Sequence, residues 1–420
     1  MDKIQIIGGA PLEGVIKISG SKNSALPILA ATLLANEEFI INNIPDLTDV
    51  DSMIKLLESF NAKIKYKKNS CFVNVGVPNS LNASYELVRK MRASFLILGP
   101  LLAKYGYVEV SMPGGCAIGT RPVDFHLEGL SKMGAQFEIK DGYVKANTKG
   151  RLKGAEINLK KTSVGATENL MIAACLADGV TRINNAAREP EVVDLGDFLK
   201  KMGATISGLG TKRIVIQGKK KLNGCNYTVM PDRIEAGTFA LGVLGCSGEL
   251  FLENVNGQIC DHLKRIFSMI DLIDLKTLNG KKKLRVTKLK KKELSLKIKT
   301  SVYPGFPTDL QAQLIAALTK SKGESEIKEN IFENRFMHIS ELKRMGADLK
   351  LNGSKVVVKG VEEIFGAEVM ATDLRASSSL IIAGLMASGK TIINRVYHLD
   401  RGYEKIEKKL TSCGAMISRI

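Results

Sequence analysis

The sequence has no tryptophan, and aromatic residues make up only 5% of its 420 residues. Surfaces that bind nucleic acid usually combine basic residues with stacking aromatic side chains, so this scarcity argues against that class. The formal net charge is nevertheless +18, and the densest basic run extends from Lys281 to Lys292. Leucine and valine alternate with its lysines, which is typical of solvated strands and a turn. A polyanion-binding patch stays open as a second interpretation, and small anionic substrates are a further use for the surplus charge.

Cysteine pairs and cofactor motifs are also missing. The seven cysteines are scattered and odd in number, without a Cys-x-x-Cys pair. This excludes a disulfide framework and a zinc ribbon, and it predicts reduced thiols in the cytoplasm. No His, Cys, Asp or Glu spacing is typical of a metal site, and no Walker loop or dinucleotide fingerprint occurs, so we expect neither a metal nor a cofactor. A phosphate group would then be held by lysines, arginines and helix amino ends.

Long hydrophobic runs do not occur either. The longest apolar patches, such as residues 380–386, are far shorter than the ~20 residues of a membrane-spanning helix. The first nine residues have no basic region followed by an apolar run, so we expect no signal peptide. The sequence therefore predicts a cytoplasmic protein that does not engage a membrane, and its length predicts roughly two to three domains.

One local pattern, a helix end followed by a turn and a strand, occurs six times. Its fifth position is occupied by Asn61, Gly134, Gly203, Ile270, Gly346 and Gly414. Glycine or asparagine is expected there, because the residue that ends a helix commonly adopts a left-handed conformation. The fourth copy has isoleucine instead, so we expect that copy to be degenerate.

A second helix, apolar on all sides, recurs with the same period and is followed each time by a β-rich segment. These helices are predicted to begin at Asn23, Arg92, Gly165, Glu235, Thr308 and Arg375. A helix that is apolar all round is buried. The sequence therefore predicts six α/β units of about 70 residues, divided into two domains of three near Met230.

Polar or charged residues stand at the opening of every one of these apolar helices. They include Lys22 and Asn23, Arg92, Lys161 to Ser163, Asp232 to Glu235, Asp309, and Asp373 with Arg375. For any single opening, a capping or ion-pair role is the ordinary explanation. All six together indicate a cluster of helix amino ends and charges suited to anions.

The segment from Pro113 to Asp124 sets a cysteine in a glycine-rich frame. Cys116 follows two glycines, and Arg121 stands five residues later. A thiol beside a cation has a lowered pKa and acts as an acid or a nucleophile, whereas an isolated thiol is more often inert. Cys175 and Cys246 lie in helical patterns and are predicted to be core residues.

Four motifs give the chain a resemblance to the UDP-N-acetylglucosamine 1-carboxyvinyltransferases, the enolpyruvyl transferases of peptidoglycan synthesis. The motifs are Gly20–Pro27, the Gly-Gly-Cys loop, Phe332–Phe336 and Asp400–Glu404. The resemblance covers essentially the whole chain and implies a two-domain inside-out α/β barrel of six repeats. It implies one domain over residues 21–230 with the cysteine loop, a second over 1–20 plus 231–420, and an active site in the cleft between them.

The resemblance also implies the reaction. The 3-hydroxyl of UDP-N-acetylglucosamine attacks C2 of phosphoenolpyruvate while C3 is protonated, and phosphate leaves by C–O cleavage. This is the first committed step of peptidoglycan precursor synthesis, which serves cell wall biogenesis, cell shape and division. The implied partners are these two small molecules, with no nucleic acid and no membrane.

Site residues follow from the same resemblance. Cys116 corresponds to the proton donor, which also forms an adduct with phosphoenolpyruvate, and Asp309 to a candidate base near the 3-hydroxyl. Phosphoenolpyruvate and its departing phosphate would be bound by Lys22, Asn23, Arg121, Arg335 and Arg401, of which Lys22 and Arg401 also count as catalytic. The nucleotide sugar would be contacted by Asn23, Arg92, Arg121, Pro122, Val123, Asp124, Phe125, Lys161, Thr162, Ser163, Val164, Asp309 and Ile331.

Two departures and two rival functions remain. Phe125 stands where leucine is common, which affects the fit of the nucleotide, and residues 276–299 are unusually rich in lysine. A shikimate 3-phosphate enolpyruvyl transferase shares the six-repeat fold but is not known for the cysteine loop. A basic repeat scaffold for nucleic acid is the second rival, and salt-sensitive DNA binding without turnover would identify it.

Overall fold

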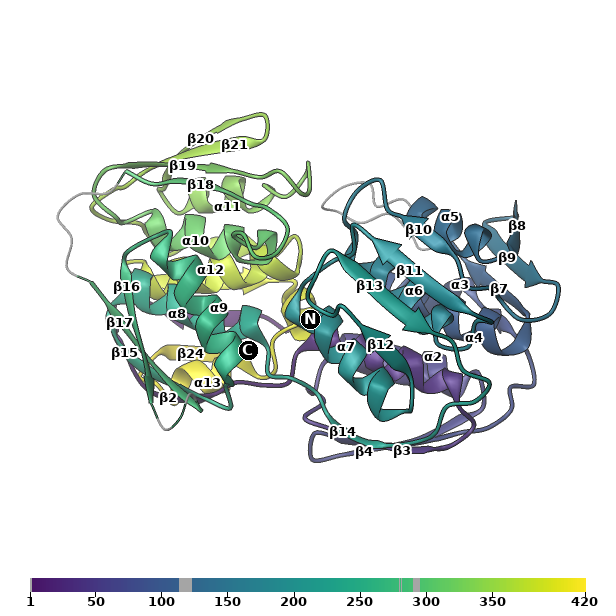
Figure 1. The fold of residues 1–420 in the computed structure, drawn as a ribbon. Helices are drawn as coiled ribbons and strands as arrows, with labels where there is room; N and C mark the ends of the chain where they lie inside the picture. Colours follow the sequence, from purple (N-terminus) through teal and green to yellow (C-terminus); the bar gives the residue numbers. More distant parts are fainter. Residues whose placement is uncertain (1, 113–122, 279, 281, 290–294) are drawn as a thin grey trace. The chain divides into compact units, whose positions relative to one another are not determined.

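The structure is a computed structural model that describes residues 2–112, 123–278, 280, 282–289 and 295–420. The described chain divides into two compact units (Figure 1). We call residues 20–112 and 123–230 the N-terminal unit, and residues 2–19 and 231–420 the C-terminal unit. Each unit is described by itself.

The N-terminal unit contains three inner helical segments, each apolar on nearly every side. They are α1 (Lys22–Ala31) with the 3-10 turn η1 (Thr32–Leu34), η2 (Arg92–Ile97) with α4 (Leu98–Tyr105), and α6 (Val164–Ala174). All residues of α6 from Ala166 to Ala174 are buried. The outer helices are α2 (Thr48–Glu58), α3 (Tyr85–Val88), α5 (Asp124–Lys132) and α7 (Pro190–Lys201). The inner helices therefore form the core of this unit, as their composition predicts.

Three four-stranded sheets enclose that core in the described part of the unit. The first contains β3 (Glu38–Asn42), β4 (Ala62–Lys67), β5 (Ser70–Val75) and β14 (Asn226–Thr228). The second contains β6 (Asn82–Ala83), β7 (Tyr107–Ser111), β8 (Ala135–Lys140) and β9 (Tyr143–Thr148). The third contains β10 (Glu156–Asn158), β11 (Val180–Asn184), β12 (Thr205–Ser207) and β13 (Arg213–Gln217).

The C-terminal unit repeats this plan. Its inner segments are α8 (Arg233–Cys246), the 3-10 turn η3 (Thr308–Leu310) with α10 (Gln311–Leu318), and α12 (Leu374–Met386). These three segments pack against one another. The other helical segments are α9 (Gly257–Ser268), α11 (His338–Arg344), η4 (Val396–Arg401) and α13 (Ile406–Thr411).

Three more four-stranded sheets surround these helices in the described residues of the C-terminal unit. One contains β1 (Ile4–Ile7), β22 (Glu368–Met370), β23 (Lys390–Asn394) and β24 (Met416–Arg419). Another contains β2 (Leu12–Lys17), β15 (Gly248–Glu253), β16 (Ile273–Leu278) and β17 (Lys283–Lys288). The last contains β18 (Lys297–Lys299), β19 (Glu324–Lys328), β20 (Asp348–Asn352) and β21 (Lys355–Lys359).

All six described sheets share one topology. The strand that follows an inner helix pairs in parallel with an edge strand on one side and antiparallel with a third strand on the other. Because all six described sheets share this strand arrangement, the predicted α/β fold of six repeated units is confirmed. The chain's first strands, β1 and β2, complete sheets whose other strands come from residues 248–419, which local sequence patterns alone do not predict.

The fourth repeat corrects an expectation. Ile270 is buried at 1% exposure, and the residue with positive φ is its neighbour Asp271, at φ 51°. A short polar side chain tolerates the left-handed conformation far better than a β-branched one. The fourth copy is therefore not degenerate, because its left-handed turn lies one residue later than the pattern placed it.

The lysine-rich segment forms the strand that its alternation predicts. Within β17, Lys283 pairs with Glu253 at 3.1 Å, and Arg285 pairs with Glu249 of the neighbouring strand β15. Part of the positive charge on this sheet is thus neutralised locally.

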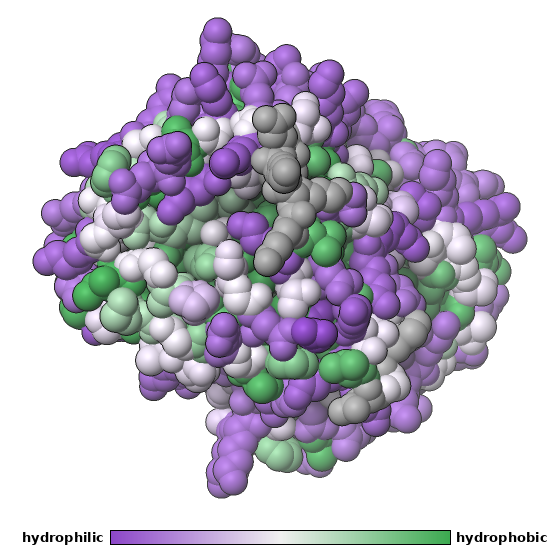
Figure 2. Space-filling view, turned by 90° about the vertical axis from the view of Figure 1, so that its left-hand side faces the viewer, coloured by the Kyte–Doolittle hydropathy of each residue, from purple (hydrophilic) through white to green (hydrophobic). Residues whose placement is uncertain are grey.

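Figure 2 looks onto the C-terminal unit, and hydrophilic residues form the rim of this face, with apolar residues in small groups among them.

Candidate functional site

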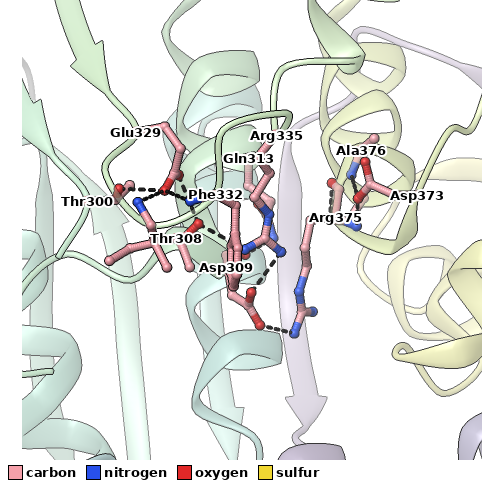
Figure 3. Close-up of polar contacts among 12 residues, drawn as sticks. Thr300, Thr308, Asp309, Gln313, Glu329, Phe332, Arg335, Asp373, Arg375 and Ala376 are labelled. Carbon is pink, nitrogen blue, oxygen red and sulfur yellow. Dashed lines mark hydrogen bonds and ion pairs between the residues drawn. The ribbon is translucent and has the colours of Figure 1, made fainter. Parts of the chain in front are cut away.

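A group of buried charges in the C-terminal unit surrounds Asp309, which lies in the turn η3 that opens an inner helix. One carboxylate oxygen lies 2.7 Å from Nη2 of Arg335, and the other lies 2.8 Å from Nη2 of Arg375 (Figure 3). Both arginine side chains are buried, at 6% and 4% exposure, whereas the Asp309 side chain is 25% exposed. The carboxylate is thus held between two guanidinium groups and still reaches solvent.

Arg375 is placed by the first turn of α12. The N-cap residue Asp373 accepts hydrogen bonds from the backbone N–H groups of Arg375, at 2.8 Å, and Ala376, at 3.1 Å. This is the side-chain cap expected where a helix leaves its first N–H groups unpaired. The two charged residues that open α12 therefore have different roles. Asp373 caps the helix, and Arg375 forms the ion pair with Asp309.

Arg335 lies on the segment that follows β19, and Glu329 organises that segment. One Glu329 oxygen accepts from the N–H groups of Ile331, at 2.7 Å, and Phe332, at 3.1 Å. The other accepts from the Thr308 hydroxyl at 2.8 Å, and the Thr308 oxygen accepts from Nη1 of Arg335 at 2.9 Å. A buried carboxylate thus ties the Arg335 segment to the residue just before Asp309 (Figure 3).

The two arginines decide the protonation of Asp309. Burial by itself would raise the pKa of its carboxyl group, but the charges of Arg375 and Arg335 and their hydrogen bonds outweigh burial and hold the pKa well below 3.8. The carboxylate therefore stays ionised and is a weak proton acceptor. This electrostatic setting favours orienting a hydroxyl group over fully removing its proton.

Lys22 occupies a comparable position in the N-terminal unit, at the first turn of α1. Its ammonium group lies 3.2 Å from the carboxylate of Asp49, which stands in the first turn of α2, and both side chains are nearly buried. Asn23, the next residue, is half-buried. The pair fixes a cation at the amino end of an inner helix, where an anion would also gain from the helix dipole.

The other described nucleotide-sugar residues predicted in the N-terminal unit lie at three helix openings, those of η2, α5 and α6. Ser163 caps α6 by accepting from the N–H of Ala166 at 3.3 Å, and the Thr162 hydroxyl donates to Asn185 at 2.9 Å. Lys161 is exposed, and Val164 begins the helix.

His126 of α5 links the α6 opening to Arg92. Its ring lies so close to Gly165 that a β-carbon there would be 3.5 Å away. Burial and, to a smaller extent, the charge of Arg92 together lower the His126 pKa to about 3. The structure therefore brings Arg92, which opens η2, near the start of α6.

The remaining predicted residues are placed as follows. Val123 is the N-cap of α5 and is buried, Asp124 is exposed in its first turn, and Phe125 is half-buried. In the C-terminal unit, Arg401 ends η4, and Ile331 is 37% exposed. Cys116, Arg121 and Pro122 lie outside the described residues.

Sequence reasoning left Arg375, Glu329 and Tyr403 out of the site. Arg375 was recognisable as a charged helix opening, but nothing in the sequence shows that it reaches Asp309. Glu329 follows a strand without a motif, and Tyr403 stands inside the Asp400–Glu404 motif without an assigned role.

The described residues contain no group of three or more His, Cys, Asp or Glu side chains that could hold a metal ion. Among them, no helix is both long and apolar enough to cross a membrane.

Comparisons with known proteins agree on one family. The family model described as EPSP synthase (3-phosphoshikimate 1-carboxyvinyltransferase) matches residues 6–410. A UDP-N-acetylglucosamine 1-carboxyvinyltransferase 1 of Caldanaerobacter subterraneus subsp. tengcongensis is 52% identical over 97% of both chains. A UDP-N-acetylglucosamine 1-carboxyvinyltransferase of Shewanella amazonensis is 50% identical over 100% of both chains.

Solved structures show the same fold. The enolpyruvyl transferase NikO from Streptomyces tendae aligns with a TM-score of 0.87 at 23% identity, covering 100% of this chain and 98% of its own. EPSP synthase from Acinetobacter baumannii aligns with a TM-score of 0.75 at 18% identity, covering 100% of both chains.

Proposed function

Since the chain belongs to the EPSP synthase family of enolpyruvyl transferases, and within it to the UDP-N-acetylglucosamine 1-carboxyvinyltransferases, we propose that it transfers the enolpyruvyl group of phosphoenolpyruvate to the 3-hydroxyl of UDP-N-acetylglucosamine. The observation that carries this proposal is the identity of 50% or more with relatives of that name over 97% or more of the chain. The matches to EPSP synthase structures are at 18–19% identity and support the fold alone.

The reaction adds the sugar hydroxyl to C2 of phosphoenolpyruvate, protonates C3, and then eliminates phosphate with C–O cleavage. The elimination takes a proton back from C3, so the product is an enolpyruvyl ether. Negative charge grows on the phosphate as it leaves, and fixed cations stabilise such charge. We assign this role to Lys22, Arg121, Arg335 and Arg401, and we assign Cys116 as the proton donor to C3.

Asp309 acts in this proposal mainly by orienting the acceptor hydroxyl. Its carboxylate is ionised and partly exposed, so it can accept a hydrogen bond from the 3-hydroxyl. Its low pKa makes it a weak general base for the ground state. As the oxygen attacks C2, however, the acidity of the hydroxyl rises, and a nearby carboxylate becomes a competent acceptor at that stage.

The nucleotide sugar is assigned to the helix openings that gather in the N-terminal unit. The contacting residues are proposed to be Asn23, Arg92, Arg121, Pro122, Val123, Asp124, Phe125, Lys161, Thr162, Ser163 and Val164, together with Asp309 and Ile331. Arg92, Arg121 and Lys161 would supply positive charge for a diphosphate, and the α6 opening offers N–H groups near its cap. Residues of both units would then serve one reaction.

The product feeds peptidoglycan synthesis in this proposal, and the working compartment is the cytoplasm. The described cysteines are all free, and Cys71, Cys175, Cys260 and Cys413 are buried, which suits a reducing environment. Cys246 is only half-buried, so its expected core position is only partly right. We propose small molecules as the partners, with no nucleic acid and no membrane.

A phosphate-release assay tests the function. Purified protein is given phosphoenolpyruvate alone, with UDP-N-acetylglucosamine, or with shikimate 3-phosphate. We expect phosphate release only with the nucleotide sugar. Lys22→Ala should strongly reduce this release. Lys3→Ala should retain it, because Lys3 forms only an exposed ion pair. Release with shikimate 3-phosphate instead would contradict the proposal and indicate the other transferase.

A further inference from the structure

Tyr403 lies at the centre of the C-terminal unit, and its phenol oxygen has four polar neighbours on the three inner helices. They are Oγ1 of Thr238 at 2.8 Å, Nε2 of Gln313 at 3.1 Å, Nη1 of Arg375 at 3.1 Å and Oγ of Ser378 at 3.1 Å. Tyr403 is 2% exposed, and its four neighbours are buried to a similar degree. We call these five residues the phenol hub.

The hydrogen bonds of the hub assign the direction of each contact. The Thr238 hydroxyl donates to the carbonyl of Ile234 at 2.8 Å, and the Ser378 hydroxyl donates to the carbonyl of Arg375 at 2.9 Å. Neither hydroxyl has a proton left for Tyr403, and the phenol has one proton, which it donates to the Ser378 oxygen at 3.1 Å. The arginine and glutamine can only donate through these nitrogens, and they fill the two lone pairs of the phenol oxygen. The phenol is therefore saturated.

Both residues that donate to the phenol, Arg375 and Gln313, also donate to Asp309. Arg375 uses Nη1 for Tyr403 and Nη2 for the Asp309 carboxylate, and its guanidinium lies 5.5 Å from the centre of the tyrosine ring. Gln313 uses the same Nε2 group for Tyr403 and for the backbone carbonyl of Asp309, at 2.8 Å. The side chain and the backbone of Asp309 are thus each connected to one phenol oxygen.

We propose that Tyr403 is a positioning residue for enolpyruvyl transfer, which acts by holding Arg375 and the Asp309 turn in the geometry that presents the carboxylate to the acceptor hydroxyl. The inference rests on the proposed function. Tyr403→Phe keeps the ring over the guanidinium but leaves Nη1 of Arg375 without its phenol acceptor, and the Gln313 amide keeps only its bonds to Asp309 and Thr238. A buried cation with an unpaired donor turns toward another acceptor, so Asp309 loses its fixed orientation.

The first test compares steady-state kinetics of Tyr403→Phe with two controls. We expect kcat to fall about 10- to 100-fold while the KM for UDP-N-acetylglucosamine changes less than about threefold, since orientation is lost rather than binding. Ser378→Ala removes one hub contact but leaves the phenol on Arg375. Tyr227→Phe removes a phenol that donates to Asp194 at 2.7 Å in the N-terminal unit. Both controls should retain kcat, and an equal loss in Ser378→Ala would overturn the proposal.

A double-mutant cycle separates positioning from general stability. In an Arg375→Lys background, Tyr403→Phe should lower kcat by less than about twofold further, because its target has already been removed. The same fold-loss in both backgrounds would show a purely structural role and overturn the inference. Should Tyr403→Phe fail to fold, Gln313→Met takes its place in the cycle, with an expected kcat loss of about tenfold. An unchanged kcat in Gln313→Met would also contradict the claim that the phenol hub positions Asp309.

A second readout does not depend on the reaction. Carboxyl-labelled aspartate NMR follows the titration of Asp309 in the wild type and in Tyr403→Phe. We expect the variant to show a raised Asp309 pKa, since a reoriented Arg375 no longer stabilises the carboxylate fully. An unchanged pKa would overturn the positioning role. If the wild type releases no phosphate with any acceptor, the proposed function fails, and this titration still decides the role of the hub.

Discussion

Asp309→Asn should destabilise the C-terminal unit strongly, although it changes only one atom of the side chain. The wild-type carboxylate forms ion pairs with two guanidinium groups at 2.7 and 2.8 Å, whose side chains are 6% and 4% exposed. An asparagine carbonyl oxygen still accepts from one arginine, but its NH2 group faces the other arginine and repels it. Breaking a buried ion pair by removing one partner costs about 3–5 kcal/mol, because a buried charge is left uncompensated. We expect the free energy of unfolding to fall by about that amount.

Urea unfolding followed by far-ultraviolet circular dichroism measures this loss, since the chain has no tryptophan for fluorescence. Asp274→Asn is the matched control in the same unit, because Asp274 forms an ion pair with Lys276 at 3.5 Å in which the two side chains are 37% and 62% exposed. Such exposed pairs contribute about 0–1 kcal/mol. An Asp309→Asn variant no less stable than the Asp274→Asn control would refute the two-arginine account of the site.

The pH dependence of this difference has a defined sign. The pKa of Asp309 is held well below 3.8 in the folded protein, so its contribution to stability is present above the unfolded-state pKa. That contribution is lost as the pH falls through the lower folded-state value. The wild type and Asp309→Asn should therefore converge in stability only in strong acid.

Three further predictions address other parts of the molecule. Stability should fall between pH 6.5 and 4, by up to about 1.4 kcal/mol per pH unit for each buried histidine. Burial and nearby arginines lower the folded pKa to about 3, about 3 and about 4 in His126, His262 and His338. Equal urea midpoints at pH 7 and pH 5 would contradict this. Gly99→Ala should cost about 1–3 kcal/mol in urea unfolding, because its β-carbon would lie 2.2 Å from the Asn169 side chain, whereas Gly165→Ala should be neutral or stabilising. Cys116→Ala should nearly abolish turnover while Cys116→Asp keeps some, and both should lose inactivation by a thiol-alkylating epoxide; a wild type that resists the epoxide would contradict this role.

The architecture was predictable because its signals are local. A run such as Leu380 to Ala387 is apolar on every side, which requires a buried helix, and the turn residues recur about every 70 residues. The place of β1 and β2 was not predictable from such patterns, because their partner strands lie hundreds of residues away. Spacing alone places Ile270 at the left-handed turn of the fourth repeat. In the structure the left-handed residue is Asp271, because a short polar side chain tolerates that conformation better than isoleucine does.

The site was predictable in its residue types more than in its contacts. The sequence shows that Asp309 and Arg375 open apolar helices, but their ion pair depends on the packing of α10 against α12. Arg335 was named through a motif, and its contact with Thr308 and the supporting carboxylate of Glu329 appear only in the structure. The role of Asp309 as a general base stays a prediction. Its two arginine partners lower the pKa of its carboxyl group, which favours a role in orienting the hydroxyl.

The product of the reaction tests the central claim most directly. Phosphoenolpyruvate labelled with heavy carbon at C2 and heavy oxygen in the C–O–P bridge is incubated with the enzyme and UDP-N-acetylglucosamine. We predict that NMR shows the labelled C2 in a vinyl ether with the sugar oxygen O3, and that the released phosphate contains the heavy oxygen. A nucleotide sugar without the vinyl ether, or heavy oxygen retained on the carbon product, would contradict enolpyruvyl transfer by C–O cleavage.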